Sequence, residues 1–381
     1  MHIYQVARRL RNYSVTVFSV ADPKLSRTEQ DGHLRYVRID TTPYHNSVVD
    51  WLLSLGSTRI GRVLDYYRYL RFVIDDLNKT RPAIIHVHNT YYFVSDLRRH
   101  LNYAPVILLH MNNSHLVNRK YKFGLQAVQA SNLVIGCSEF IVNEIESRFP
   151  QAQGRTALLH NGTDLKDFDP SMRHSQPSKS IREKLGISPD GPVLGFAGRL
   201  VPEKGVDVLL RAAEIVAARL KSTLTILICG GPWPPTGTNG HLTQLKDLAK
   251  RAEAAGVNVC FTGFVTPSDM PSYFSLMDIF VAPALWDEPF ATVYIEAGAM
   301  GLPVITSARG GIPELIVPGE SGLLLAEPSD PNCLANAIIA LLQNPSLAHQ
   351  YGMKLRSQVE NGLTWDHIAQ ATDECYDAII N

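Results

Sequence analysis

Two carboxylates, Glu288 and Glu296, stand eight residues apart in the segment ALWDEPFATVYIEAGAMG at 284–301. Pro289 follows the first of them, and proline is tolerated in the first turn of a helix because its missing N–H has no partner there. From Phe290 to the end of the segment the pattern is typical of a helix. We therefore place Glu288 on a loop at a helix start and Glu296 within the helix.

The start of this helix is a predicted anion site. The free N–H groups of Phe290, Ala291 and Thr292 would lie there, where the helix dipole also favours negative charge. This arrangement suits a ligand with phosphate and several hydroxyls, such as a sugar nucleotide. Each carboxylate alone has an ordinary explanation, because acidic residues complement helix starts and glutamates in helices are commonly solvated. The choice between a ligand-binding role and an ordinary structural role for these glutamates therefore depends on the surrounding sequence.

A second group of candidates follows a predicted strand in GFAGRLVPEKGVDVLL at 195–210. The strand ends at Gly198, and Arg199 and Lys204 flank the short loop before the next helix. Ligands collect at the carboxyl ends of strands in open α/β sheets. Two cations at this place could hold a diphosphate without a metal, Arg through its fork of donors and Lys as a point charge. Taken alone, they would be solvated surface charges.

Aromatic and imidazole side chains stand at other predicted strand ends. Gly263 and Phe264 follow the strand NVCFT, where an aromatic ring and free backbone groups could meet a nucleobase, although a lone Phe also fits a core. His86, His88 and His110 end strands in the first half of the chain. The HVH at 86–88 has no third ligand or HExxH-like spacing with it, so no metal site is predicted. His110 is the better candidate for facing a ligand.

Composition excludes several classes of protein. The chain has 381 residues, of which 45% are hydrophobic and 19% charged, which is typical of a globular chain with two domains. Its 36 basic and 36 acidic residues cancel, so no global field attracts nucleic acid. The five cysteines are scattered without a CxxC, which indicates neither a disulfide framework nor a zinc knuckle. Without a membrane-length apolar run or a signal-peptide pattern, a cytoplasmic protein is predicted.

Apolar runs alternate with helical patterns along the chain, which predicts doubly wound open sheets. An amphipathic helix is expected at 3–10 and a strand at 14–20, and buried parallel strands at 83–87, 106–109, 133–136, 157–159, 192–196, 224–229, 258–261, 279–282, 303–306 and 322–325. The polar stretch DPSMRHSQPSKS interrupts the series. We expect a first domain at 1–168, a linker at 169–186, a second domain at 187–363 and a C-terminal helix at 364–381 that crosses back to the first domain.

At this point a family resemblance is plain. GRLVPEKG (198–205), GF (263–264), EPFATVYIE (288–296), GLPVI (301–305) and GGIPELI (310–316) resemble the retaining glycosyltransferases of family 4, in type and in spacing. HNGTD at 160–164 is similar to the segment that precedes the interdomain connection in that family. The resemblance covers nearly the whole chain and is most specific in residues 190–330. It implies the GT-B fold, in which two Rossmann-like, doubly wound parallel-sheet domains face a cleft.

The resemblance also implies roles for matching residues. Arg199 and Lys204, after Gly198, would bind the donor diphosphate and stabilise the leaving nucleoside diphosphate. Glu288 would contact the hydroxyls of the donor sugar beside the N–H groups of Phe290, Ala291 and Thr292. Glu296 would accept hydrogen bonds from the ribose, Gly263 and Phe264 would lie by the nucleobase, and His110 would face the transferred sugar from the first domain.

The implied reaction moves a hexose from a nucleoside-diphosphate sugar to a hydroxyl of a glycan, a lipid or a small molecule, with retention of configuration. No essential metal or other cofactor is expected, and no nucleic-acid partner. One departure from the family pattern concerns the first domain: a strand and a Gly-rich loop normally precede the first helix, and here Met1 leads directly into that helix. The missing strand would normally be central in its sheet.

Three readings therefore stay open. The leading one is a hexosyltransferase. A non-catalytic or impaired donor-binding subunit is the alternative, because the first strand is missing. A GT-B sugar-nucleotide epimerase fits the sequence less well, because GRLVPEKG and the EPF segment point to transfer.

Weak peripheral contact with the inner face of the membrane is a further hypothesis. Basic and aromatic residues alternate in the predicted helix at 59–77, and such a helix could rest on an anionic surface. These residues are Arg59, Arg62, Arg68, Arg71, Tyr66, Tyr67 and Tyr69. An ordinary solvated helix face would have the same composition.

Overall fold

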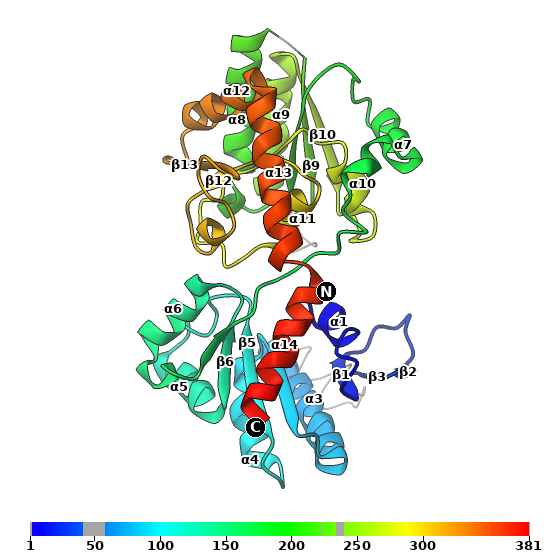
Figure 1. The fold of residues 1–381 in the computed structure, drawn as a ribbon, viewed down its shortest axis with the longest axis vertical. Coiled ribbons are helices and arrows are strands. Elements are labelled where there is room, and N and C mark those ends of the chain that lie inside the picture. Colours follow the sequence, from blue (N-terminus) through cyan, green and yellow to red (C-terminus); the bar gives the residue numbers. More distant parts are fainter. Residues whose placement is uncertain (1, 41–57, 222, 234–239, 381) are drawn as a thin grey trace. The chain divides into compact units, whose positions relative to one another are not determined.

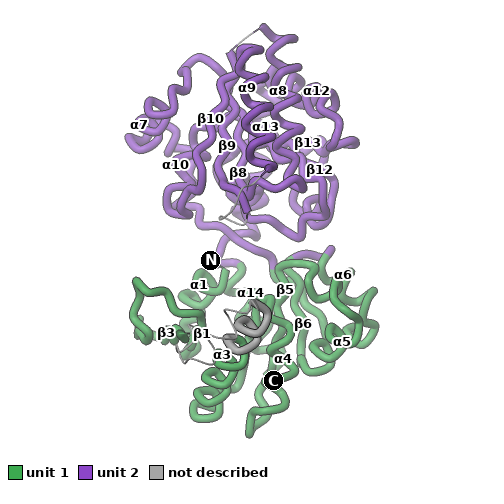
Figure 2. Tube along the Cα trace, turned by 180° about the vertical axis from the view of Figure 1, so that it is seen from behind, with its two compact units in different colours: residues 1–137, 141–159, 368–381 green, residues 138–140, 160–367 purple. Residues whose placement is uncertain are grey.

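A computed structural model describes residues 2–40, 58–221, 223–233 and 240–380. The chain divides into two compact units (Figure 2). Unit 1 contains residues 1–137, 141–159 and 368–381, and unit 2 contains residues 138–140 and 160–367. The last helix, α14 (Trp365–Ile380), begins in unit 2 and continues into unit 1. The chain thus returns to the unit in which it started.

The strands of unit 1 form two sheets (Figure 1). Its elements before α14 are α1 (His2–Ala7), β1 (Val15–Val20), β2 (Thr28–Asp31), β3 (Leu34–Ile39), α3 (Thr58–Thr80), β4 (Ile84–His88), α4 (Tyr91–His100), β5 (Val106–Met111), α5 (Tyr121–Ala130), β6 (Leu133–Gly136), α6 (Glu139–Arg148), η1 (Pro150–Ala152) and β7 (Thr156–Leu158). Strands β4, β5, β6 and β7 follow one another in a parallel sheet, while β1, β3 and β2 make a separate one. Among the described residues, no strand joins the two sheets.

This division differs from the continuous parallel sheet expected for the first domain. Strand β2 pairs with β3 in an antiparallel hairpin, whose turn contains Gly32 with a φ of 57°, a conformation that glycine adopts easily. All four side chains of β2 are exposed, so no apolar alternation marks it in the sequence. The strands before β4 thus form a sheet of their own, in which β3 is central.

Unit 2 holds one parallel sheet of six strands. Its elements are η2 (Pro170–His174), α7 (Gln176–Lys184), β8 (Val193–Ala197), η3 (Pro202–Lys204), α8 (Val206–Leu220), β9 (Leu224–Cys229), α9 (Gly240–Ala254), β10 (Val257–Gly263), α10 (Met270–Phe274), β11 (Ile279–Ala282), α11 (Thr292–Ala299), β12 (Val304–Ser307), η4 (Ile312–Glu314), β13 (Gly322–Leu325), α12 (Pro331–Gln343) and α13 (Pro345–Gly362). The spatial order is β10, β9, β8, β11, β12, β13. Helix α8 packs beside α9 and α12, and α11 packs against α13 (Figure 1).

The residues at 169–186 form structure of their own within unit 2. Asp169 caps η2 by accepting from the backbone N–H of Ser171, and Ser175 caps α7 in the same way through Ser178. Arg173 forms an ion pair with Asp278, which directly precedes β11. This stretch, expected to be a linker because it is polar, therefore packs against the sheet.

The aromatic residues of α3 divide between packing and exposure. The Tyr66 ring stacks on Phe93 of α4 at 5.1 Å between centroids, and its hydroxyl donates to Asp96 at 2.5 Å. Tyr69 also stacks on Phe93, whereas Tyr67 is 60% exposed. Two of the three tyrosines in the predicted membrane face therefore hold α3 against α4, and the side chains of Arg59 and Arg62 lie outside the described residues. No helix in the described part of the chain is both long enough and apolar enough to cross a membrane.

Candidate active site

The topology of unit 2 places a crevice between β8 and β11. The chain runs outward from β8 through β9 to β10, and then in the opposite direction from β11 through β12 to β13. In an open parallel sheet, the carboxyl ends of the strands on either side of such a switch point are where ligands bind. Arg199 and Lys204 follow β8, and Glu288 follows β11. Three predicted site residues thus start from neighbouring strand ends.

Backbone contacts hold these two loops together. The Leu285 N–H donates to the Glu203 carbonyl at 2.8 Å. Gly205, directly after η3, has a φ of 68°, and a Cβ at this position would overlap the carbonyl oxygen of Pro283. Glycine at 205 therefore permits the close approach of the two loops, which brings the side chain of Lys204 toward Glu288.

Lys204 and Glu288 form an ion pair at this crevice. The side chain of Lys204 is 14% exposed, and the Glu288 residue is only 5% exposed. The same Glu288 oxygen accepts from the indole N–H of Trp286 at 3.2 Å, and the Lys204 ammonium lies 5.2 Å from the Trp286 ring centroid. Charges this far from solvent are held only when they are paired and hydrogen-bonded. The site therefore contains a fixed cation beside a fixed carboxylate.

The Gly310-Gly311 pair supports the backbone of Glu288. The Gly311 N–H donates to the Glu288 carbonyl at 2.8 Å. A Cβ on Gly310 would overlap that same carbonyl, and a Cβ on Gly311 would overlap the carbonyl of Pro289. The GGIPELI motif thus acts through close backbone packing, which fixes the loop that carries the carboxylate.

Helix α11 begins two residues later than expected. Ala291 has a ψ of 132°, so the backbone is still extended there and the first helical residue is Thr292. The reason is that Phe290 is buried, stacked on the His160 ring at 4.4 Å, with its carbonyl accepting from the Asn161 side chain at 2.8 Å. Ala291 is therefore the residue that caps the helix, and its N–H and those of the first helical residues, from Thr292 onward, have no partner within the helix, while Phe290 lies just before the cap.

Asn161 is a residue whose role the sequence reading missed. HNGTD was noted for its resemblance alone, and nothing in the sequence shows that it meets Phe290. Replacing Asn161 with Leu would leave the buried Phe290 carbonyl without this donor, which costs about 1–3 kcal/mol. We expect urea unfolding to show a loss of that size, whereas Asn332→Leu, at an exposed position beside the Asp330 cap, should cost less because water can replace its side-chain hydrogen bond.

Glu296 lies in the second turn of α11 and is half-buried. Burial raises its pKa to about 7, and a hydrogen bond with Thr292 acts in the opposite direction. The carboxyl is therefore close to half protonated at neutral pH. The ionised form accepts strong hydrogen bonds from ligand hydroxyls through both oxygens, whereas the protonated form keeps only a weaker carbonyl acceptor and gains an O–H donor.

The remaining predicted residues of unit 2 stand at the exposed rim. Arg199 is exposed, and its guanidinium lies 5.7 Å from the ring centroid of Trp233, itself 55% exposed. Phe264, after β10, is 81% exposed, which excludes the alternative that it belongs to the core. Gly263 has a φ of 72°, and its carbonyl accepts from the Gly230 N–H at 3.0 Å. An exposed aromatic ring at a strand end is available for stacking.

His110 belongs to unit 1 and lies one residue before the end of strand β5, in register with His88 of β4. It is fully buried, and burial, together with His2 and His86, lowers its pKa well below the usual range, against an opposing interaction with the Leu159 backbone. Its imidazole is therefore neutral. The structure also brings His2 of α1 to this pair, a third imidazole that the sequence reading did not consider.

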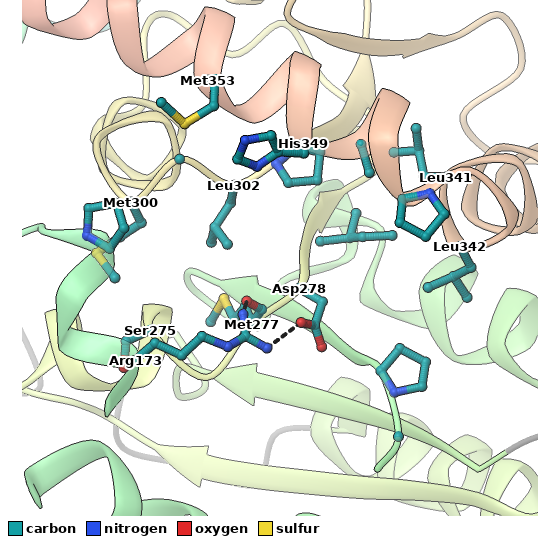
Figure 3. A pocket seen from close by; sticks show the side chains of 18 of the residues that line it. Arg173, Ser275, Met277, Asp278, Met300, Leu302, Leu341, Leu342, His349 and Met353 are labelled. Carbon is teal, nitrogen blue, oxygen red and sulfur yellow. Dashed lines mark hydrogen bonds and ion pairs between the residues drawn. The ribbon is translucent and has the colours of Figure 1, made fainter. Parts of the chain in front are cut away.

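The cavity drawn in Figure 3 lies elsewhere in unit 2. Its volume is about 810 Å³, and it is lined by residues around the amino ends of β8, β11 and β12, including Pro192, Asp278 and Pro303. Met300, Leu302 and Met353 make much of its wall apolar, while the Arg173–Asp278 ion pair closes one side (Figure 3). None of the predicted site residues lines it, since they follow the opposite ends of the strands.

Family profiles match both halves of the chain. The profile described as Glycosyl transferases group 1 matches residues 177–358, and that described as Glycosyltransferase Family 4 matches residues 1–167. Together they cover most of both units. This chain belongs to glycosyltransferase family 4. The paired Lys204 and Glu288 fall within the first match, whereas His110 falls within the second.

Individual relatives of this family 4 glycosyltransferase agree in fold. The spore coat protein SA of Bacillus subtilis is 29% identical over 94% of this chain and 89% of its own length. Sucrose-phosphate synthase from Thermosynechococcus elongatus superposes with a TM-score of 0.79 at 24% identity, over 100% of this chain and 92% of that one. Anabaena HepE in complex with UDP-glucose gives 0.75 at 19% identity, over 99% and 95%. These structures show that the fold is GT-B.

Proposed function

We propose that this glycosyltransferase is a retaining hexosyltransferase that uses a nucleoside-diphosphate sugar and needs no metal. The observation that carries the proposal is the buried Lys204–Glu288 pair at the switch point of unit 2. A similar protein, Anabaena HepE, has been solved with UDP-glucose, which supports a nucleotide sugar as the donor.

In this proposal each group of the site receives one part of the donor. Lys204 and Arg199 bind the diphosphate, and the amides at the start of α11 add donors without charge. Glu288 accepts from hydroxyls of the sugar, Glu296 accepts from the ribose, and Phe264 stacks on the base. The preorganised cation binds the phosphate, and the carboxylate beside it binds the sugar of the same ligand. A free nucleotide lacks the sugar and would make only the first of these contacts.

The reaction breaks the bond between the anomeric carbon and the phosphate oxygen, and the leaving diphosphate keeps the electron pair. The acceptor hydroxyl attacks from the face that the diphosphate leaves, and its proton passes to the departing phosphate oxygen. Negative charge grows on the phosphate as the bond breaks, and Lys204 and Arg199 stabilise it there. No protein nucleophile is needed, so the two carboxylates have binding roles.

The class of reaction is tested by turnover of the purified chain. Nucleoside diphosphates are screened first by thermal shift, and the best binder then defines the nucleotide-sugar donor for transfer and hydrolysis assays. Release of nucleoside diphosphate from that donor, with an α- or β-linked product of unchanged anomeric configuration by NMR, supports the proposal. An inverted product contradicts retention, and turnover that depends on an added divalent cation contradicts the metal-free mechanism.

Nucleotide binding should depend on pH through Glu296. Because the raised pKa leaves this carboxyl protonated in mild acid, its charge-assisted hydrogen bonds from ribose hydroxyls weaken as pH falls through about 7. We expect calorimetry to show UDP affinity rising several-fold between about pH 6 and about pH 8. Glu296→Gln removes the titration but keeps the shape, and it also controls for ionisation of the phosphate. If the unchanged chain and Glu296→Gln show the same pH dependence of UDP affinity, Glu296 is not its cause.

A second candidate function is a donor-binding subunit without transferase activity. The observation that favours it is the division of the unit 1 strands into two separate sheets, because acceptor binding depends on that unit in GT-B enzymes. UDP binding by calorimetry, with no turnover of UDP-sugars on any tested acceptor, would support this reading. Turnover that Lys204→Ala abolishes would exclude it.

Contact with a membrane surface is the remaining proposal. The exposed side chains of Tyr67, Arg71 and Phe72 of α3 and of Tyr92 of α4 could rest on an anionic lipid surface. Sedimentation with phosphatidylserine-containing vesicles should then show binding that weakens at high salt. The absence of binding at low salt would reject it.

A further inference from the structure

Three imidazoles gather in unit 1, outside the site of unit 2. His88 and His110 are paired in register on the parallel strands β4 and β5, so their side chains project from the same face of the sheet. His2 reaches them from α1. One ring nitrogen from each of the three lies within 4.8 Å of the others, and the ring centroids are 4.8 to 5.4 Å apart.

Ring nitrogens of His88 and His110 are buried without a hydrogen-bond partner among the described residues. His110 is 0% exposed, and apart from the interaction with the Leu159 backbone neither of its ring nitrogens has a hydrogen-bond partner in the described part of the protein. The Nδ1 of His88 is buried and unpartnered there as well. Buried polar atoms nearly always have a hydrogen-bond partner. A buried polar atom without one indicates a site for a ligand, an ion or a water molecule. Two neighbouring imidazoles of the cluster share this property.

We propose that His2, His88 and His110 bind a divalent transition-metal ion, Zn²⁺ in the first place. Imidazole nitrogen suits zinc, copper, nickel and cobalt, whereas magnesium and calcium prefer oxygen. A tetrahedral ion with nitrogens at 2.0–2.1 Å would separate the nitrogens by roughly 3.4 Å, so nitrogens that now lie up to 4.8 Å apart have to converge by up to about 1.4 Å. Among the described residues no further His, Cys, Asp or Glu joins the group, so the fourth position is open to water.

His86 lines the cluster without belonging to the ligand set. Its ring stacks on His88 at 4.3 Å between centroids, and its Nδ1 is paired with the Tyr376 hydroxyl at 2.7 Å. This contact fixes the His86 ring and restricts the orientation of the His88 ring beside it. The partners of metal-binding residues commonly set the ligand orientation in this way.

A metal at this place would compete with the role proposed for His110. This consequence rests on the proposed function, in which His110 faces the transferred sugar. An imidazole nitrogen bound to Zn²⁺ cannot contact a sugar hydroxyl, so Zn²⁺ loading should lower transferase turnover and EDTA should restore it. Metal binding itself is measured without donor or acceptor, so failure of the site and failure of the proposed function give different results.

The test uses the full chain without a histidine tag, stripped with EDTA. Titration with Co²⁺ is followed by its visible absorption, which is strong only in tetrahedral sites, and Zn²⁺ binding is followed by calorimetry. We expect saturation at one ion per chain. His2→Asn and His88→Asn should each weaken binding at least about tenfold. His115→Asn, which changes an exposed histidine of the same unit, should leave it unchanged.

Several results would overturn the site. These are no visible Co²⁺ spectrum, binding that persists in both His2→Asn and His88→Asn, or binding that His115→Asn also removes. Circular dichroism checks whether His88→Asn folds. If it does not, metal binding by His2→Asn is the deciding measurement, because His2 is only half-buried on a short helix and its replacement should not prevent folding.

Discussion

Lys204→Ala should lower transferase turnover by at least about 100-fold, because it removes the cation that stabilises charge on the leaving diphosphate. Among the described residues, the same change leaves the buried Glu288 carboxylate with the Trp286 indole as its remaining side-chain donor. Removal of one partner of a buried ion pair costs up to about 3–5 kcal/mol of folding free energy. Activity and stability should therefore fall together in this variant, measured by turnover and by urea unfolding.

A double variant separates the two effects. Lys204→Met with Glu288→Leu removes both charges and keeps the volume, so stability should return toward that of the unchanged chain. Transferase activity should stay lost if Lys204 acts on the phosphate. Lys246→Ala, an exposed lysine of the same unit, should change neither quantity. Recovery of turnover in the double variant would show that Lys204 serves only to neutralise Glu288.

The positions of the site residues relative to strands were predictable from sequence. Apolar runs of four to six residues read as buried parallel strands, and the strand expected at 192–196 is observed as β8 (Val193–Ala197). Because ligands collect at the carboxyl ends of such strands, the amino-acid sequence alone indicates Arg199 and Lys204 as ligand-binding candidates. Local pattern is sufficient here because a buried strand must be apolar along its whole length.

The contacts within the site were not predictable, because they join residues far apart in the chain. The Lys204–Glu288 pair spans 84 positions, and the Asn161–Phe290 hydrogen bond spans 129. The second contact also explains why α11 starts at Thr292: burial of Phe290 against His160 keeps the backbone extended beyond the point where local propensity favours a helix. Tertiary packing overrides propensity in such cases.

Two further differences have the same origin. The stretch at 169–186 is polar and was expected to be a linker, yet its serine and aspartate side chains cap two short helices. Caps require these residue types, so composition alone cannot distinguish a capped helix from a flexible connection. His2 likewise joins His88 and His110 only through the packing of α1, which no spacing between residues 2 and 88 could indicate.

Gly310→Ala should disable the site by displacing the Glu288 loop. Gly310 has a φ of 61°, and an added Cβ would overlap the Glu288 carbonyl, which is backbone and cannot rotate away. We expect a loss of about 2–4 kcal/mol in urea unfolding from the combination of strain and overlap. UDP affinity by calorimetry should fall as well, because the loop carries the carboxylate that pairs with Lys204.

Gly319→Ala is the matched control for this prediction. Gly319 has a similar φ of 78°, but a Cβ there would meet no atom within 4 Å. Gly319→Ala should therefore lower the free energy of unfolding by about 1–2 kcal/mol, the cost of placing alanine in a left-handed backbone conformation, and should leave UDP affinity unchanged. The difference between the two variants measures what the close approach at Gly310 contributes. Equal losses of stability, or equal UDP affinities, would show that the glycine pair does not position Glu288, and the GGIPELI motif would then need another explanation.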